Sequence, residues 1–357
     1  MSLAIGIVGL PNVGKSTLFT ALTKKQVEIA NYPFATIDPN VGVVAVPDER
    51  LTKLAEISHS KETIPTVVEF VDIAGLVKGA NKGEGLGNQF LTHIREVDAV
   101  LYMVRAFEGT DIQHVEQSID PVRDFDIIRT ELALKDLEAV ERRLERARKD
   151  SKTGDKDKLR ELAVLEQWFA ALEEGTHLRE VLEGTQDDTN RALLRELQLL
   201  TAKPAMAVVN TRGEEVPGAL SEVFEQLRIE CVPLNAREEL DGADLSPEER
   251  AELGLGESAL PRLIQAAYTT LNLITFFTTG EKETRAWTVK KGSTAPQAAG
   301  VIHTDFEHKF IRAEVIQWDK LLEAEGWTQA RGKGLIRTEG KGYILKDGDV
   351  IVVLHSA

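Results

Sequence analysis

The stretch Gly9-Leu10-Pro11-Asn12-Val13-Gly14-Lys15-Ser16 decides the fold, because it matches the pattern G-x-x-x-x-G-K-[ST] in full. An apolar run over 3–8 precedes it and predicts a strand, and residues 16–23 predict a helix. In such a strand–loop–helix unit, backbone N–H groups turn toward phosphate oxygens and the helix N-terminus adds positive charge. The sequence therefore predicts a phosphate-binding P-loop.

The side chains of this loop and of two downstream segments predict a magnesium–nucleotide site. Lys15 is expected to reach the β- and γ-phosphates, and the Ser16 hydroxyl to bind Mg²⁺. Asp72, in Asp-Ile-Ala-Gly75 after an apolar run, would supply a carboxylate near the metal, while the Gly75 N–H would contact the γ-phosphate. Thr36 would close on the metal through its hydroxyl. The predicted phosphate-binding residues are Asn12, Val13, Gly14, Lys15, Ser16 and Thr17.

The loop expected to select the base departs from the guanine-specific pattern N-K-x-D. The strand predicted over 204–210 ends in Asn210-Thr211-Arg212-Gly213, which lacks both the lysine and the aspartate. Without that carboxylate the site loses its main contact with guanine, whereas Asn210 can pair with an adenine amino group or ring nitrogen. ATP is therefore expected to bind more tightly than GTP, although Glu214 would restore guanine recognition if the loop is one residue longer. Asn235 and Ala236 would form the second base-side loop through backbone groups, and Thr211 belongs to the first.

The remaining pattern predicts three units. Strands that alternate with helices indicate a mostly parallel α/β sheet covered on both faces, at 1–123 and 201–279. Within 124–200, apolar residues recur at spacings of three and four on both sides of a polar break at 150–157, which predicts an antiparallel helical hairpin. Residues 280–357 predict a small α+β module. Other expected strands are 41–46, 64–73, 99–104, 229–234, 287–289, 310–316, 342–345 and 350–354, with a helix at 318–325.

The composition is that of a globular protein. The chain has 357 residues, 42% of them hydrophobic, and a net charge of −15, which excludes collagen-like, low-complexity and wholly disordered proteins. One cysteine, Cys231, allows no internal disulfide and indicates a reducing compartment. The apolar start lacks a basic leader, and no run approaches the roughly 20 apolar residues that span a bilayer. We therefore expect a cytoplasmic protein with no membrane partner.

Basic residues gather in two places on this acidic chain. Residues 142–160 hold nine basic against four acidic side chains, which indicates either a solvated hairpin tip or a contact for the phosphate backbone of rRNA or tRNA. The tail has basic residues interleaved with glycines, which could also follow RNA phosphates. These tail residues are Arg331, Lys333, Arg337, Lys341 and Lys346.

Five longer motifs are similar to one known family. GLPNVGKST, NYPFATIDPN, DIAGLVKGANKGEGLGNQFL, RAFEGTDIQHVE and FFTTGEKETRAWTV resemble the YchF/Obg-like ATPase family within the translation-factor-related P-loop GTPases. The resemblance covers nearly the whole chain. It implies an ATPase whose P-loop domain is interrupted by a coiled-coil hairpin, a C-terminal TGS domain of β-grasp fold, and binding to ribosomes or a ribosomal subunit. One departure is the family's N-x-x-E, which here reads Asn-Thr-Arg-Gly-Glu.

The catalytic group is expected to differ from that of small GTPases. Leu76 stands where many of them place the glutamine that orients the attacking water, which predicts slow hydrolysis, as in a switch. The family resemblance suggests His114 as the replacement, with His93 as the other candidate, and Phe107 as a contact to the base. Asn12 is similar to the asparagine that coordinates potassium in some related enzymes, so K⁺ is a second cofactor hypothesis beside Mg²⁺.

Two other functions remain open on the sequence alone. The first is a GTPase of the same fold. The second is a nucleotide-stabilised scaffold or RNA-binding module, in which the hairpin and tail hold a complex together and hydrolysis is incidental. Base competition separates the first from an ATPase, and blocking hydrolysis separates the second.

Overall fold

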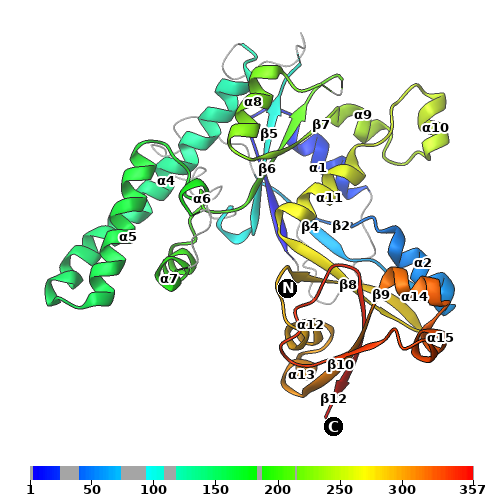
Figure 1. Ribbon diagram of the computed structural model, residues 1–357. Coiled ribbons are helices and arrows are strands. Elements are labelled where there is room, and N and C mark those ends of the chain that lie inside the picture. The colour runs from blue at the N-terminus through cyan, green and yellow to red at the C-terminus, as the bar shows by residue number, and fades with distance from the viewer. Residues whose placement is uncertain are drawn as a thin grey trace.

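The computed structural model describes residues 3–24, 40–73, 94–107, 118–182, 187–213 and 215–356. These residues form a parallel sheet with helices on both faces, a helical hairpin that projects from it, and a C-terminal module with its own sheet (Figure 1). None of the described helices has the length and apolar character needed to span a membrane.

The first sheet has six strands in the order β2-β4-β1-β5-β6-β7. All neighbours are parallel except β2 and β4, which pair antiparallel at one edge. Every residue of β5 and β6 is buried, as expected for central strands covered on both faces. The strands are β1 (Ala4–Val8), β2 (Val41–Ala45), β4 (Val67–Asp72), β5 (Ala99–Arg105), β6 (Ala205–Asn210) and β7 (Glu230–Leu234).

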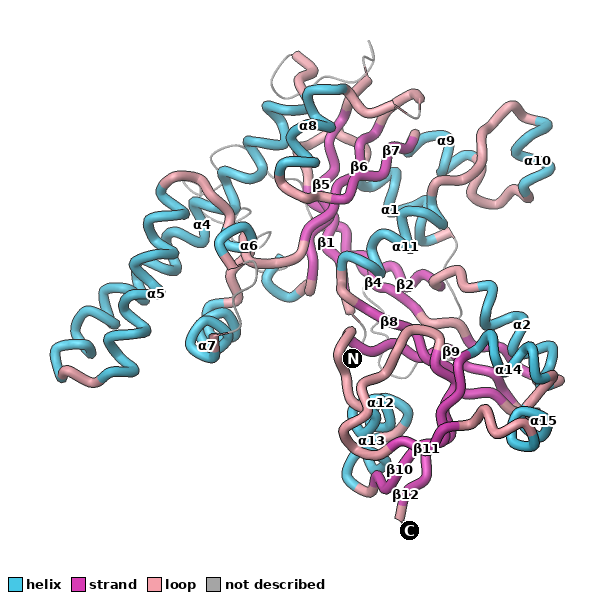
Figure 2. Tube along the Cα trace, in the orientation of Figure 1, coloured by secondary structure: helices cyan, strands magenta, loops and turns pink. Residues whose placement is uncertain are grey.

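Helices cover both faces of this sheet, as the alternating pattern predicted (Figure 2). Helices α1 and α11 lie on one side, and α8 with the first turns of α4 on the other. Phe125 on α4 meets Tyr102 of β5 and Phe224 of α8 edge to face, which fixes the start of the hairpin on the sheet. The helices are α1 (Lys15–Thr23), α8 (Gly218–Gln226), α9 (Ala236–Asp241), α10 (Pro247–Glu252) and α11 (Leu260–Thr270).

The helical hairpin has the predicted form. Its polar break becomes the short 3-10 helix η3, and Asp155 caps the returning helix by accepting from the N–H groups of Asp157 and Lys158. The facing apolar residues, among them Leu144, Leu165 and Trp168, make a core separate from that of the sheet. The elements are α4 (Pro121–Asp150), η3 (Ser151–Thr153), α5 (Lys156–Glu173), α6 (Leu178–Val181) and α7 (Asp188–Leu197).

A buried carboxylate anchors the base of the hairpin where the chain returns toward β6. Asp136 accepts hydrogen bonds from the N–H groups of Leu200 (3.0 Å) and Thr201 (2.7 Å) and from the Thr201 hydroxyl (2.7 Å). Burial raises the pKa of Asp136 to about 6, against the lowering effect of these donors. Asp136 thus helps to hold the outgoing and returning chains together.

The second sheet has the order β11-β10-β12-β8-β9-β3. The β8–β9 hairpin, the helix α12 on one face and the parallel pairing of β12 with β8 give a β-grasp arrangement, as the resemblance implied. The strands are β3 (Glu62–Ile64), β8 (Leu273–Thr279), β9 (Glu283–Lys290), β10 (Phe310–Gln317), β11 (Arg337–Glu339) and β12 (Asp349–His355). The helices are α12 (Ala295–Ile302), α13 (Thr304–His308), α14 (Trp318–Ala324) and α15 (Trp327–Gly332). We call residues 273–356 the C-terminal module.

Two expected boundaries differ from the structure, one within an expected strand and one between two expected domains. The single strand expected at 64–73 is divided at Pro65 and Thr66 into β3 and β4, which belong to different sheets. The division expected at 279/280 separates β8 from β9, although these strands pair over their whole length in the second sheet. Residues 46–66, including α2 (Glu49–Ser58), thus leave the first sheet and join the C-terminal module.

The strand expected at 342–345 is wrong. Ile344 forms only an isolated bridge with Thr294. Asp349 instead organises this segment, because its Oδ2 accepts from the Tyr343 hydroxyl (2.8 Å) and from the Lys346 N–H (2.9 Å). These local bonds satisfy the chain as a turn, which competes with a strand ladder.

Candidate nucleotide site

The phosphate loop connects the carboxyl end of β1 to the start of α1. Asn12 (φ 63°) and Gly14 (φ 105°) both take the left-handed backbone conformation that curls the loop. A Cβ at Gly14 would lie 2.5 Å from the Asn210 amide nitrogen, and one at Gly9 would lie 2.5 Å from the Met103 carbonyl oxygen. Close approach therefore requires both glycines of the motif, and the backbone curvature also requires Gly14.

Lys15 lies across the loop that precedes it. Its Nζ donates to the carbonyl oxygens of Gly9 and Leu10, each at 2.9 Å, and the residue is only 8% exposed. Burial lowers the pKa of Lys15 to about 8, while the nearby Asp72 charge acts in the opposite direction. A phosphate oxygen in this loop would supply the ammonium with the negative charge that the two carbonyls only partly replace.

Ser16 and Asp72 form the polar pair that a magnesium ion would need. The Ser16 hydroxyl donates to Asp72 Oδ2 at 3.1 Å, and the Asp72 N–H donates to the Asn40 carbonyl at 2.9 Å. Burial raises the pKa of Asp72, which a bound cation would reverse. No group of three or more His, Cys, Asp or Glu side chains suited to a metal occurs in the described ranges. Magnesium at this pair would therefore complete its shell with phosphate oxygens and water.

Asn210 joins the phosphate loop to the loop after β7. Its Nδ2 donates to the Val13 carbonyl at 2.9 Å, and its Oδ1 accepts from the Ala236 N–H at 3.1 Å. Asn235 uses its side chain to cap α9, accepting from the N–H groups of Arg237 (3.1 Å) and Glu238 (3.3 Å). The structure thus gives the Asn210 amide a bracing role that the sequence alone did not reveal, and one Nδ2 hydrogen remains for a base.

Phe107 lies between the ends of β5 and β6 with two arginines near its ring. The guanidinium carbon of Arg105 is 4.5 Å from the ring centroid, and that of Arg212 is 5.7 Å from it. The Arg105 Nε also donates to the Phe107 carbonyl at 3.1 Å. Sequence reasoning did not identify this pair of arginines. The available signal was a charged residue, Arg105, at the end of an apolar strand, and the structure buries it fully.

The structure brings most of the predicted site together at the carboxyl ends of the parallel strands, where ligands bind in sheets of this type. Asp72 lies beside Ser16, and Asn210, Thr211, Asn235 and Ala236 lie on the adjacent loops. Other predicted residues lie outside the described residues: Thr36, Gly75, Leu76, His93, His114 and Glu214.

Comparison with known proteins identifies the family. One family model, described as 50S ribosome-binding GTPase, matches residues 4–135, and the model for the C-terminal part of YchF GTPases, described as a protein of unknown function (DUF933), matches residues 273–355. The ribosome-binding ATPase YchF of Escherichia coli O157:H7 is 52% identical, with 100% of both chains covered. The protein of the same name from Bacillus subtilis is 48% identical, with 98% of both chains covered. The chain belongs to the YchF family.

A solved YchF structure extends the likeness to the whole fold. The YchF GTPase of Schizosaccharomyces pombe is 40% identical, covers 99% of this chain and 98% of its own, and has a TM-score of 0.85. At that similarity the P-loop sheet, the hairpin and the C-terminal module are features shared within the YchF family. The predicted fold class and the family resemblance are both confirmed.

Lys15 predicts a pH dependence of nucleotide binding. With a pKa of about 8 in the free protein, Lys15 loses its proton as the pH rises above 8, whereas bound phosphates would keep it charged. Binding then requires proton uptake, so the affinity for ATP with magnesium should be constant below pH 8 and fall by up to about tenfold per pH unit above it. Calorimetry between pH 6.5 and 9.5 measures this slope.

The matched control is Lys15→Arg, because a guanidinium keeps its charge throughout this range. We expect weaker but pH-independent binding from that variant. Equal slopes in the two proteins would contradict the assignment of the pH dependence to Lys15.

Proposed function

We propose that this chain is a magnesium-dependent ATPase that acts as a slow nucleotide switch and binds ribosomes or ribosomal subunits. Relatives named ribosome-binding ATPase YchF, similar over their full length, support the activity and the partner. The observation that carries the proposal is the joining of Lys15, Ser16 and Asp72 at the ends of two neighbouring strands, β1 and β4. A ribosomal partner would place the protein in the cytoplasm.

The phosphates and the metal are assigned to the loop and to the end of β4. The backbone of Asn12 to Thr17 would surround the phosphates, Lys15 would bind their β- and γ-oxygens, and Ser16, Thr36 and Asp72 would serve the Mg²⁺. The ion neutralises charge on the phosphates when bound. The Gly75 N–H would contact the γ-phosphate and so distinguish ATP from ADP.

The base is assigned to the region between Phe107 and the loop at Asn235 and Ala236. The β6 loop has Gly213 where guanine-specific relatives have the aspartate, so this position offers no carboxylate to a guanine ring. Asn210, braced between Val13 and Ala236, holds the base side against the phosphate side. These features support ATP as the preferred nucleotide, with GTP binding more weakly.

Catalysis is assigned to His114, since leucine at position 76 cannot orient water. Asn12, in the left-handed turn of the loop, is the residue proposed to face a potassium ion beside the phosphates. Equal hydrolysis rates in sodium and potassium buffers would remove that second assignment.

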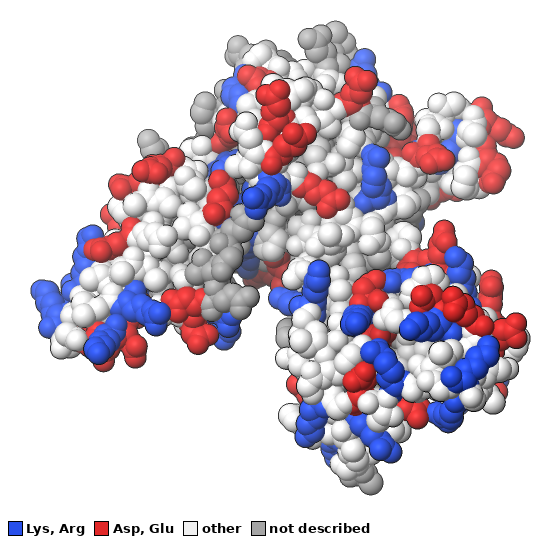
Figure 3. Space-filling model, viewed as in Figure 1, with Lys and Arg blue, Asp and Glu red and all other residues white. Residues whose placement is uncertain are grey.

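The ribosome is assigned to the hairpin tip and the C-terminal module, with rRNA or tRNA as the chemical partner. Figure 3 shows Lys and Arg gathered at the free end of the hairpin, whereas the module carries both signs interspersed. At the tip, Arg142, Arg146 and Lys149 are exposed, but Arg143 is only 13% exposed and pairs with Glu161 and Glu196. In the module, Arg331 and Arg337 are paired with acidic residues, which makes the hairpin tip the stronger candidate.

Base preference is tested by calorimetry of ATP and GTP, each with magnesium, on nucleotide-free protein. We expect tighter binding of ATP. Asn210→Ala should weaken binding about tenfold or more, because it removes two buried hydrogen bonds, each of which is worth about 1 kcal/mol.

The control for this loss is Asn190→Ala, which removes a buried amide on α7 in the distant hairpin and should leave the nucleotide affinity unchanged. Tighter binding of GTP would instead assign guanine recognition to Glu214 or another acid, and the protein would then be a GTPase of the same fold.

The role of His114 is tested by steady-state turnover and ATP affinity. His114→Ala should lower the turnover about a hundredfold, the range for a removed acid–base or water-positioning group, while the affinity stays the same. His93→Ala is the matched control and should retain the rate. An unaltered rate in the first variant would exclude a catalytic role for His114.

The hairpin contact is tested by reversing three exposed charges, Arg142→Glu, Arg146→Glu and Lys149→Glu. Ribosome binding should weaken, and the slope of log affinity against log salt should fall by about one for each lost phosphate contact. The opposite change on the same helix, Glu141→Lys with Glu145→Lys, should strengthen binding. Unchanged ribosome binding in both variants would leave the tip as a solvated surface, the other interpretation of its charge.

A further inference from the structure

Alternate residues at the end of β5 form a row that begins at the phosphate loop. A Cβ at Gly14 would lie 3.2 Å from the Met103 Cε, so the Met103 side chain faces this loop. Side chains two residues apart on a strand point to the same face of the sheet, which places Arg105 beyond Met103 on this side. Phe107 follows two residues later. The row therefore leads from the phosphate loop to the carboxyl edge of the sheet.

The end of β5 is fixed beside Asn210. In the parallel pair of β5 and β6, Arg105 lies opposite Asn210, and the Ala106 N–H donates to the Asn210 carbonyl at 2.9 Å. The side chain of Asn210 in turn braces the phosphate loop. Phe107 is therefore the first residue beyond this contact, at the edge of the sheet to which the base is assigned.

Two contacts from Arg105 hold Phe107 in place. The guanidinium carbon lies 4.5 Å from the centroid of the Phe107 ring, and Nε donates to the Phe107 carbonyl at 3.1 Å. Arg105 is 0% exposed, whereas Phe107 is half-buried. The guanidinium therefore contacts the ring from inside the protein, and part of Phe107 remains open to solvent.

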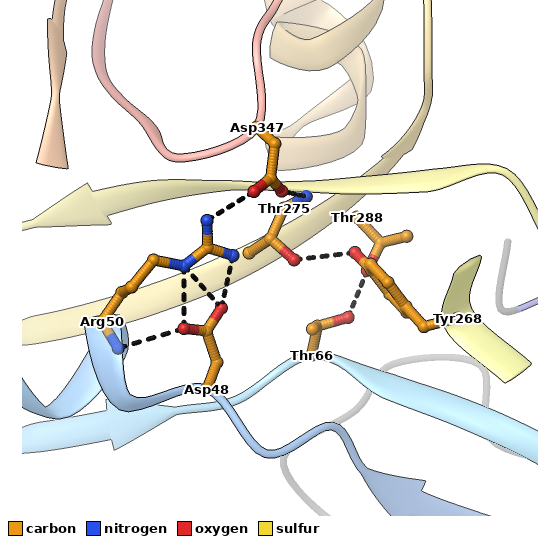
Figure 4. A network of polar contacts seen from close by, with 7 residues as sticks. All are labelled: Asp48, Arg50, Thr66, Tyr268, Thr275, Thr288 and Asp347. Carbon is orange, nitrogen blue, oxygen red and sulfur yellow. Dashed lines mark hydrogen bonds and ion pairs between the residues drawn. The ribbon is translucent and has the colours of Figure 1, made fainter. Parts of the chain in front are cut away.

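A similar contact elsewhere in the chain has different electrostatics. The guanidinium carbon of Arg50, at the start of α2, lies 5.2 Å from the centroid of the Phe277 ring. The same guanidinium donates to Asp48 and to Asp347, which belong to a polar network at the C-terminal module (Figure 4). Burial lowers the pKa of Arg50, but the hydrogen bonds to these two carboxylates outweigh burial and raise it. Arg50 is thus a neutralised cation that holds α2 on the module.

Arg105 shares its ring with a second cation. The guanidinium carbon of Arg212, in the loop after β6, is 5.7 Å from the centroid of the same Phe107 ring. Burial and then the charge of Arg212 lower the pKa of Arg105. Placing two like charges at one ring costs free energy, and groups perturbed in this way gather at functional sites. The arrangement favours a role for the Phe107 ring beyond packing.

The Phe107 ring is also open to a flat group from the solvent side. Arg212 is exposed, and its planar guanidinium is the group that reaches the ring. Nucleobases are flat as well, and they stack on aromatic rings as guanidinium planes do. A base can therefore take the position that the Arg212 guanidinium has here.

We propose that Arg105 is a positioning residue for the nucleotide base. It holds the Phe107 ring from inside the protein, and the base stacks on that ring in the position of the Arg212 guanidinium. Arg105 does not touch the nucleotide and acts only through the ring. Because every base has a flat face, this contact strengthens the binding of ATP and of GTP alike. The inference rests on the proposed nucleotide site.

The test separates the base from the phosphates. Calorimetry on nucleotide-free protein gives the affinity for ATP, for GTP and for tripolyphosphate, which carries the phosphates alone, each with magnesium. Phe107→Ala should weaken the binding of both nucleotides about tenfold, on the scale of base–aromatic stacking, and leave tripolyphosphate binding unchanged. Arg105→Gln, which removes the buried charge from the ring, should cause a selective loss of about threefold or more.

A double variant tests whether Arg105 acts through the ring. In the Phe107→Ala background, Arg105→Gln should cause no further loss of nucleotide affinity, because the ring that Arg105 positions is absent. Thermal melting shows whether each variant is folded. If Arg105→Gln unfolds, Arg105→Lys replaces it, because an ammonium keeps the buried charge but cannot stack as a guanidinium does, and the same selective loss is expected.

The matched control is Arg50→Gln, which takes an arginine away from the Phe277 ring of the C-terminal module. All three affinities should match those of the parent protein. Equal losses for nucleotides and tripolyphosphate in Arg105→Gln, or losses that add in the double variant, would overturn the inference while leaving the ATPase proposal intact. Absence of magnesium-dependent ATP binding in the parent protein would overturn both.

Discussion

The amide of Asn210 is the contact on which the site depends, because it joins the phosphate loop to the loop after β7. Its nitrogen bonds the carbonyl of Val13 and its oxygen bonds the N–H of Ala236, so one side chain fixes the spacing of loops that are about 220 residues apart in the chain. The same nitrogen leaves no room for a Cβ at Gly14. The curvature of the phosphate loop, the absence of a side chain at Gly14 and the position of the loop after β7 are therefore parts of one geometric constraint.

Much of the fold could be predicted from local patterns. The P-loop, the strands expected at 204–210 and 229–234 and the helical hairpin could be predicted because short apolar runs and apolar spacings of three and four report burial directly. The pairing of Ser16 with Asp72 was also expected, because residues at the ends of neighbouring parallel strands converge. The residues at 36, 75 and 114 stay predictions, since they lie outside the described residues.

The two boundary errors came from contacts between residues distant in sequence. An apolar run gives no sign that its first residue, Ile64, belongs to another sheet, and only Pro65, which lacks an N–H, marks the change between β3 and β4. The expected boundary at 279/280 is wrong for a similar reason. Strand β8 follows α11 directly in sequence, so nothing in the local pattern shows that it pairs with β9 in the second sheet. The bracing role of Asn210 was missed because hydrogen-bond partners of a side chain cannot be read from the motif that contains it.

The interleaved chain of the C-terminal module has a consequence for folding during synthesis. Glu62 is synthesised 221 residues before Glu283, its neighbour in the second sheet. The apolar side of α2 is likewise synthesised long before Phe277 and Ala286, against which it packs. Contacts of such long sequence separation form slowly, since the closure entropy of the loop is spent before they are made. The first sheet can pair its strands once β7 has emerged, while the second sheet must await the last residues of β12. The nascent chain therefore carries an unfinished second sheet until β12 has been synthesised.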